Sequence, residues 1–104
     1  MLAMARTMAA RIAARHPDVT RVLLFGSCAR GDFSAQSDLD LLILLKSSSL
    51  PVSDRIAEFL NDCTAYPTDV FPLTEGELQE RLRDGDPFWT QAVKEAVELK
   101  DGGT

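Results

Sequence analysis

The sequence predicts an α/β domain in which helices pack on a small, three-stranded mixed sheet. Amphipathic segments alternate along the chain with short apolar runs of strand length, and this alternation is typical of layered α/β proteins. The chain has 104 residues, of which 45% are hydrophobic and 26% charged, enough for one modest core and an ordinary globular surface. We therefore expect residues 1–104 to form a single domain.

The first third of the chain predicts a helix, a strand and a polar loop. Residues 1–15 carry apolar side chains at helical spacing. This spacing favours an amphipathic helix over a targeting peptide, the alternative that their alanine- and arginine-rich composition leaves open. After a turn at His16–Asp18, residues 19–25 indicate a strand that ends at Gly26. Ser27–Arg30 has the composition of a short helical turn that leads into a loop.

Two further strands are expected, separated by a helix. Asp38–Lys46 is dense in leucine and isoleucine and gives the strongest strand pattern in the chain. Pro67–Leu73 gives a third strand, and its second proline suggests an edge or an end of the sheet. Between the two strands, apolar side chains at helical spacing predict a helix over Asp54 to about Thr64.

The C-terminal third predicts two helices and a tail. Thr74–Glu77 has the spacing of a capping box, which opens the first of these helices. Asp86–Pro87 then supplies an N-cap and a first-turn proline to a last helix. Its apolar stripe runs from Phe88–Trp89 to Ala96–Val97, and the aromatic pair is interpreted as core rather than as an interface anchor. We expect residues 101–104 to be a frayed tail.

Charge and residue counts exclude several classes of protein. Eleven Lys and Arg against sixteen Asp and Glu give a net charge of −5, so the surface is poorly suited to binding nucleic acid. The longest apolar run, Leu41–Leu45, is far shorter than the ~20 residues that cross a bilayer. One histidine and two cysteines make neither a zinc site nor a disulfide framework, and solitary thiols suit a reducing cytoplasm.

The chemistry is concentrated in Gly26–Ser27 and, after ten further residues, in Asp38 and Asp40. Side chains two apart on a strand point to the same face, so the two carboxylates project together from the start of one strand. Two neighbouring carboxylates repel each other unless a cation neutralises their charge. Oxygen ligands select Mg²⁺, with Mn²⁺ as the alternative ion. Gly26–Ser27 supplies a flexible backbone and a hydroxyl for phosphate oxygens. The pattern predicts a metal–nucleotide site.

Asp69 is a third acid for this site, and Arg30 is a candidate phosphate contact. If the Pro67–Leu73 strand lies beside the acid-bearing strand, Asp69 converges with Asp38 and Asp40. Three carboxylates support two metal ions about 3.5–4 Å apart. Asp69 is also a candidate general base for an attacking hydroxyl, unless it is only a cap at a strand end. Arg30 either contacts a phosphate or pairs with an acid to hold the loop.

The run F-G-S-C-A-R-G-D-F-S-A-Q-S-D-L-D-L-L-I resembles the nucleotidyltransferase superfamily typified by DNA polymerase β, and is most similar to its minimal nucleotidyltransferases. The motif covers Phe25–Ile43, and Asp69–Phe71 looks like the third-acid strand. The resemblance implies transfer of a nucleoside monophosphate from an NTP, most simply AMP from ATP, to a hydroxyl, with release of pyrophosphate. It also implies metal binding by Asp38, Asp40 and Asp69, and phosphate binding by Gly26 and Ser27.

The same resemblance implies a partner. Minimal nucleotidyltransferases commonly pair with helical HEPN-type proteins as antitoxin and toxin, which implies adenylylation of such a partner, on a tyrosine. Two alternatives remain open at this stage. The chain is either a non-catalytic antitoxin that occludes its partner and keeps a vestigial site, or a small-molecule nucleotidyltransferase, which generally needs a further domain for the acceptor.

Overall fold

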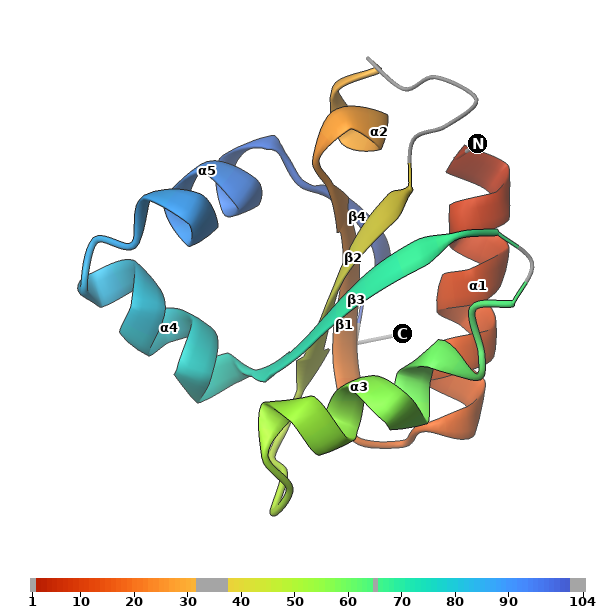
Figure 1. Ribbon diagram of the computed structural model, residues 1–104, viewed down its shortest axis with the longest axis horizontal. Helices are drawn as coiled ribbons and strands as arrows, with labels where there is room; N and C mark the ends of the chain where they lie inside the picture. Colours follow the sequence, from red (N-terminus) through yellow and green to blue (C-terminus); the bar gives the residue numbers. More distant parts are fainter. Residues whose placement is uncertain (1, 32–37, 65, 102–104) are drawn as a thin grey trace.

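The computed structural model describes residues 2–31, 38–64 and 66–101 (Figure 1). Helices and strands alternate along the chain, which confirms the α/β class predicted from the sequence. The elements are α1 (Leu2–Arg15), β1 (Val19–Phe25), α2 (Ser27–Arg30), β2 (Leu39–Leu45), α3 (Val52–Leu60), β3 (Thr68–Thr74), α4 (Glu75–Arg83), α5 (Pro87–Glu95) and β4 (Val97–Asp101).

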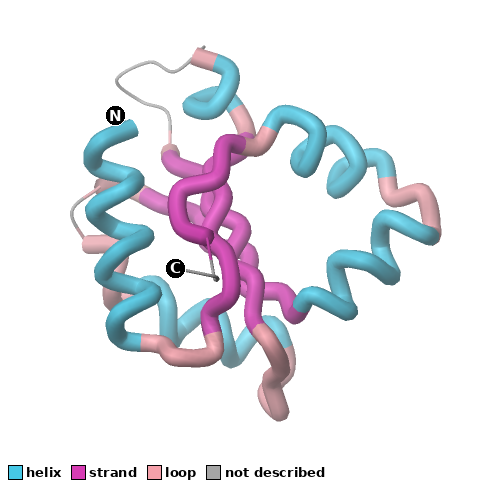
Figure 2. Tube along the Cα trace, turned by 180° about the vertical axis from the view of Figure 1, so that it is seen from behind, coloured by secondary structure: helices cyan, strands magenta, loops and turns pink. Residues whose placement is uncertain are grey.

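The strands form one mixed sheet in the order β3-β2-β1-β4. β2 and β3 are parallel and are joined through α3, whereas β1 is antiparallel to both of its neighbours. α1 and α3 cover one face of the sheet, and α4 and α5 cover the other (Figures 1 and 2). The sheet is therefore the middle of three layers. Among the helices so described, none combines the length and apolar character needed to cross a membrane.

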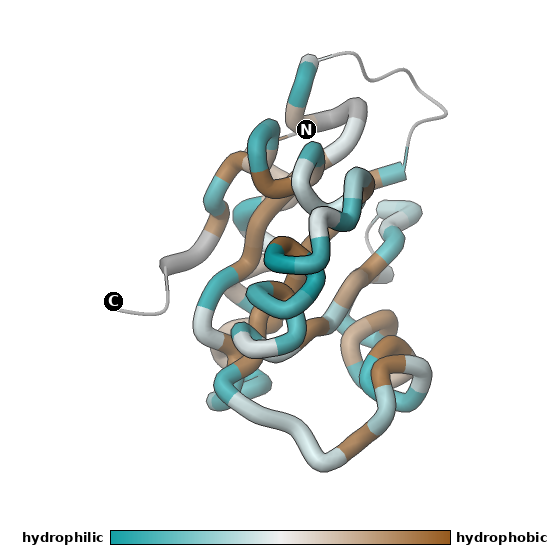
Figure 3. The backbone as a smooth tube through the Cα atoms, turned by 90° about the vertical axis from the view of Figure 1, so that its left-hand side faces the viewer, coloured by the Kyte–Doolittle hydropathy of each residue, from teal (hydrophilic) through white to brown (hydrophobic). Residues whose placement is uncertain are grey.

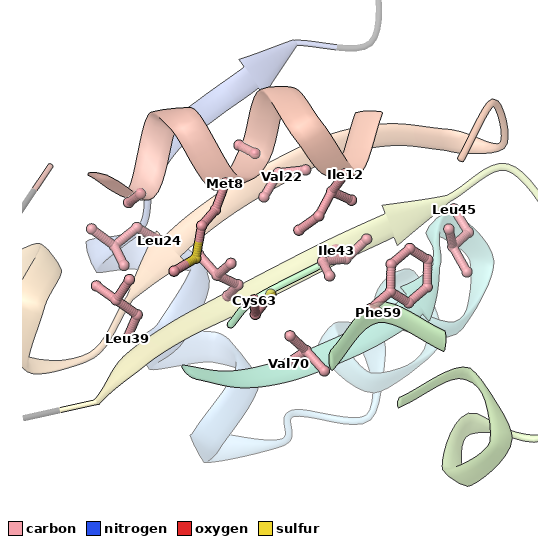
Figure 4. Packing of buried hydrophobic residues seen from close by; sticks show 13 residues of the cluster. Met8, Ile12, Val22, Leu24, Leu39, Ile43, Leu45, Phe59, Cys63 and Val70 are labelled. Carbon is pink, nitrogen blue, oxygen red and sulfur yellow. The ribbon is translucent and has the colours of Figure 1, made fainter. Parts of the chain in front are cut away.

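β2 is buried on both faces because it lies between two strands and two helical layers. Leu41 and Ile43 join the cluster beneath α1 and α3, where Phe59 also packs (Figure 4). Leu42 and Leu44 point the other way and join the cluster beneath α4 and α5. In the hydropathy view the interior strands are mainly brown, whereas the helices mix brown and teal (Figure 3). Burial on both faces explains why this segment gave the strongest strand pattern.

The prediction of three strands was wrong, because the described residues contain a fourth strand, β4. The last helix, α5, ends at Glu95, whereas Ala96–Val97 had been assigned to the end of its apolar stripe. Asp101 belongs to β4, so it is not part of a frayed tail. Residues 102–104, the rest of that predicted tail, lie outside the described residues.

The alternation of residue types explains why the chain leaves the helix here. Val97 and Leu99 alternate with Glu98 and Lys100, which is the period-two pattern of a strand. Pairing with β1 also gives hydrogen-bond partners to a strand edge that three strands would have left open. The apolar pair Ala96–Val97 at the junction of α5 and β4 is compatible with both helical and strand periodicity. The apolar pattern alone therefore did not separate the end of the helix from the start of the strand.

The helix before β3 is shorter at its C-terminal end than predicted. α3 ends at Leu60 rather than near Thr64. The next residues turn inward, so that the Asp62 carboxylate is buried and its Oδ2 lies 2.8 Å from His16 Nε2. Arg15 Nε lies 3.2 Å from the other oxygen, Oδ1. The turn therefore ties the end of α3 to the end of α1.

The predicted caps of α4 and α5 are confirmed. Thr74 Oγ1 accepts a hydrogen bond from the Glu77 amide, and the Glu77 carboxylate accepts one from the Thr74 amide. At the start of α5, Asp86 Oδ1 accepts hydrogen bonds from the amides of Phe88 and Trp89. Each cap satisfies helix amides that lack an intrahelical acceptor.

An ion pair that no sequence pattern marks connects α3 to α4. Arg55 is only 4% exposed, and its guanidinium donates to both carboxylate oxygens of Glu77, at 2.6 and 3.1 Å. It also donates to the carbonyl oxygens of Leu50 and Pro72, at 2.8 and 3.1 Å. The buried charge is thus paired and hydrogen-bonded, as burial requires.

Candidate active site

Phe25, Asp40 and Asp69 lie side by side on three neighbouring strands. Phe25 is the register partner of Asp40 in β1 and β2, and Asp40 is the register partner of Asp69 in β2 and β3. Side chains in one row of a sheet point to the same face. The face here is the one that α5 covers, since Phe25 packs there against Trp89. The strand bearing Asp69 therefore does lie beside the strand bearing Asp40.

The carboxylates of this region are close enough to repel one another. Asp38 directly precedes β2 and is exposed, whereas Asp40 is half-buried. The pKa of Asp40 is raised above its ordinary value, first by burial and then by the charges of Asp69 and Asp38. Glu95 adds a fourth negative charge, and Arg30 partly opposes the effect. Such crowding of negative charge is typical of a site that attracts cations.

Gly26 makes the close approach between the end of β1 and the acids feasible. Its φ of +78° lies in the left-handed region that favours glycine. A Cβ atom at this position would overlap Asp40 Oδ2, so a side chain would collide with the carboxylate. The amides of Ala29 and Arg30 both donate to the Gly26 carbonyl and wind the chain into α2. Ser27 is the first residue of α2, and its side chain lies outside the described part of the structure.

Glu95 contacts the glycine bend, and the sequence analysis did not find it. Its Oε1 accepts a hydrogen bond from the Gly26 amide at 3.1 Å. Arg30 Nη1 donates to Oε1 and Oε2 of the same carboxylate, at 3.0 and 3.1 Å. Of the two roles left open for Arg30, the structure therefore shows the pairing with an acid. No spacing rule links Glu95 to the motif, because the contact depends on how α5 packs over the sheet.

The negative charge and the oxygen atoms of these acids suit a divalent cation, but the side chains are not positioned to coordinate one. In the ranges 2–31, 38–64 and 66–101, no three His, Cys, Asp or Glu side chains form a group that could hold a metal ion. A cation would nevertheless relieve the repulsion around Asp40, and oxygen donors are the ligands that Mg²⁺ and Mn²⁺ prefer. Side-chain rotations of Asp38, Asp40 and Asp69 would have to complete such a set.

A cavity of about 380 Å³ opens beside Asp40 and Glu95, whereas Asp38 and Asp69 are not among its lining residues. Its walls come from α2, from α5, from the ends of β1 and β2 and from the middle of β3, and they include Gly26, Asp40 and Glu95. A second cavity, of about 250 Å³, lies at the opposite end of β1 and β2 near His16 and Arg55, and none of the clustered carboxylates lines it. The first cavity is therefore the one that has access to the predicted chemistry.

Comparisons with known proteins concern the family and the fold of the chain. Residues 6–96 match the family of the nucleotidyltransferase domain, which is most of the chain. A candidate nucleotidyltransferase from Sulfolobus solfataricus, known from its crystal structure, is 30% identical with a TM-score of 0.69. That likeness covers 94% of this chain and 78% of the other.

Two further proteins are similar over less sequence or at lower identity. A chain of a toxin–antitoxin complex crystallised with AMP-PNP has a TM-score of 0.59 at 17% identity, over 92% of this chain and 73% of that chain. At this identity the likeness concerns the fold alone. A Methanocaldococcus jannaschii protein described as a candidate protein adenylyltransferase is 65% identical over 26 residues. The match spans 25% of this chain and 26% of that protein.

Proposed function

Because this chain belongs to the nucleotidyltransferase-domain family, we propose that it transfers AMP from ATP to a hydroxyl of a partner protein and releases pyrophosphate. The observation that carries the proposal is the row formed by Asp40 and Asp69, with Asp38 at the start of β2 and the glycine bend beside it. The row combines clustered negative charge with a backbone that closely approaches it, and an adjacent cavity gives access.

Asp38, Asp40 and Asp69 are the residues that would hold two Mg²⁺ ions, with Mn²⁺ as the alternative ion. Bound there, the metal would neutralise the triphosphate and lower the pKa of the attacking hydroxyl. The hydroxyl oxygen forms a bond to the α-phosphorus. The bond from that phosphorus to the oxygen shared with the β-phosphate breaks, and pyrophosphate leaves with that oxygen. Asp69, exposed on the edge strand β3, accepts the hydroxyl proton as general base.

The phosphate contacts are assigned to Gly26, Ser27 and Arg30. The Gly26 amide and the Arg30 guanidinium are donors suited to phosphate oxygens, and both now donate to Glu95. Because a carboxylate and a phosphate are both anions, the triphosphate has to replace Glu95 at these donors. Glu95 therefore keeps the donors in place before the nucleotide arrives.

The acceptor is assigned to a helical HEPN-type protein, with the present chain as its antitoxin. The fold shared with a toxin–antitoxin complex crystallised with AMP-PNP supports both a toxin partner and an ATP-like nucleotide. The short identity to a candidate protein adenylyltransferase supports a protein hydroxyl as acceptor. The cytoplasm is the compartment where ATP and such a partner meet.

The direct test is label transfer. We expect incubation with Mg²⁺, ATP labelled at the α-phosphate and the product of the adjacent gene to leave label on that partner. The double variant Asp38→Asn/Asp40→Asn should leave the partner unlabelled, while circular dichroism shows an intact fold. Absence of label with folded wild-type protein, or equal labelling by the double variant, would contradict the proposal.

One observation favours a second function, which is occlusion of the partner without chemistry. No three ligating side chains in the described ranges form a group that could hold a metal ion, as expected of a vestigial site. The same double variant separates the two functions, because an occluding protein would still neutralise its partner after losing both carboxylates. An adenylylating protein would fail to do so.

We expect Gly26→Ala to lower both stability and nucleotide transfer. The left-handed backbone conformation costs a non-glycine residue about 1–2 kcal/mol, and the new Cβ would push the Asp40 carboxylate out of place. Transfer should therefore fall at least roughly tenfold, the factor that corresponds to about 1.4 kcal/mol. Gly85→Ala is the matched control, because Gly85 has a φ of +73° but nothing within 4 Å of the added Cβ.

Urea unfolding and the labelling rate, measured on both variants, check this prediction. Both variants should lose stability, Gly26→Ala the more because its Cβ collides with Asp40, and only Gly26→Ala should lose transfer. If both variants kept the wild-type rate, close packing of Gly26 against Asp40 would have no role in the reaction.

A further inference from the structure

The cavity beside the acids has a polar end and an aromatic end. Gly26, Arg30, Asp40 and Glu95 form the polar end. We define the aromatic slot as the rest of the lining, which consists of Phe25, Phe71, Phe88, Gln91 and Ala92. We propose that the aromatic slot holds the purine base of the nucleotide. This inference rests on the proposed function and adds to it a site for the base.

The rings of the aromatic slot come from three separate elements. The centroid of Phe25 on β1 lies 5.3 Å from that of Phe71 on β3 and 5.9 Å from that of Phe88 on α5. Phe71 and Phe88 lie 6.1 Å apart. The three rings therefore form one continuous aromatic wall along the cavity.

Phe88 corrects the prediction that both aromatic residues at the start of α5 are core. Trp89 is 8% exposed and packs in the core, whereas Phe88 is 52% exposed. Phe88 shares one face of the helix with Gln91 and Glu95, since residues three, four and seven apart project together. Its ring thus stands at the mouth of the cavity, with surface available for a ligand.

The occupant follows from the two ends taken together. A ligand that fills the whole cavity can bring a flat ring to the aromatic wall and, together with Mg²⁺, an anionic group that takes over the Gly26 amide and Arg30 from Glu95. A nucleoside triphosphate carries both in one molecule. Base stacking on aromatic side chains needs only a π face, which every base has, and a purine offers the larger one. Gln91, whose Nε2 donates to Glu95 Oε2 at 3.4 Å, adds a side-chain carbonyl oxygen that can accept a hydrogen bond from a base edge.

The volume agrees with this assignment. A cavity of about 380 Å³ lies within the range of small-molecule sites, which are mostly apolar with a few placed polar groups. The other occupant to consider is an aromatic side chain of the acceptor protein. That occupant would leave the phosphate donors at the polar end to a second molecule, so the experiment has to separate the two.

The experiment compares ATP with inorganic tripolyphosphate, both in the presence of Mg²⁺. Titration calorimetry on the wild type should show tighter binding of ATP, because only ATP brings a base. Phe88→Ala should weaken ATP binding by about tenfold and leave tripolyphosphate binding unchanged. Trp89, the single tryptophan of the chain, lies 4.9 Å from Phe88 and 5.6 Å from Phe71 between ring centroids. Its fluorescence should change with ATP and not with tripolyphosphate.

Val93→Ala is the matched control. Val93 is also exposed on α5, but it does not line the cavity, so its loss should change neither affinity. Phe88→Tyr, which keeps the ring, should restore the affinity for ATP.

Three results would overturn the inference. If Phe88→Ala binds ATP like the wild type, the base lies elsewhere, and a raised KM for the acceptor in that variant would assign the aromatic slot to the acceptor. If ATP and tripolyphosphate lose affinity equally, Phe88 acts on the phosphate end or on the fold. If the wild type binds neither ligand, the proposed function fails together with the inference. The first two results, by contrast, overturn only the inference.

Discussion

Asp40→Asn is expected to reduce nucleotide transfer about 1,000-fold or more and to leave the fold at least as stable as the wild type. Asparagine keeps the shape of the side chain but removes the charge that would hold a divalent cation. Metal assistance is worth several kcal/mol, and about 4 kcal/mol corresponds to a factor of about 1,000. Stability should not fall, because burial and the neighbouring Asp69 and Asp38 carboxylates disfavour a charge at Asp40.

The opposite directions of these two effects make the prediction specific. Replacement of a residue with a merely structural role would lower the activity and the stability of the protein together. The measurements are the rate of label transfer from ATP and the Tm of the same preparation. Asp18→Asn, which removes an exposed carboxylate from a turn far from the acids in the sheet, is the control and should match the wild type in both. A wild-type transfer rate in Asp40→Asn would remove Asp40 from the proposed metal site.

Glu77→Gln is expected to destabilise the fold by about 3 kcal/mol, because it leaves the buried Arg55 guanidinium without its counter-charge. For a chain of this size, that loss lowers the Tm by roughly 15 °C. Glutamine still fits the capping box of α4, so the effect isolates the ion pair between α3 and α4. The measurement is urea unfolding at neutral pH, followed by circular dichroism.

The same pair predicts how stability depends on pH. Hydrogen bonds from Arg55, opposed by burial and assisted by the Thr74 amide, lower the pKa of Glu77 from 4.5 to about 2. Its contribution to stability is therefore complete above pH 4.5 and is lost as the pH falls towards 2. Glu77→Gln should remove this part of the acid sensitivity. Glu80→Gln, exposed on the same helix, should not change it. An unchanged acid transition in Glu77→Gln would show that other carboxylates cause it.

Local patterns in the sequence were enough to predict most of the elements of the fold. Apolar periodicity and turn residues indicated β1, β2 and β3, and the capping patterns at Thr74 and Asp86 marked where α4 and α5 begin. β4 was missed because five residues of alternating type directly follow a helix with a compatible stripe. Its identity depends on pairing with β1, a contact distant in sequence.

The candidate site divides in the same way. The spacing of Gly26 and Asp40 along the chain reflects a local approach of two adjacent strands, so a motif can encode it. The position of Asp69 required only that β3 lie beside β2, which a parallel crossover favours. Glu95 and Phe88 reach the site through the packing of α5, and no local pattern specifies that packing.

The central strand has a consequence for the chain before it has folded. Leu41–Leu45 is a run of five apolar residues with high strand propensity, the type of window that associates with other copies of itself when it is not covered. Charged residues flank the run, with Asp38 and Asp40 before it and Lys46 after it, and such flanking charges act as gatekeepers against aggregation. The acids that the proposed chemistry needs thus also protect the nascent polypeptide during synthesis.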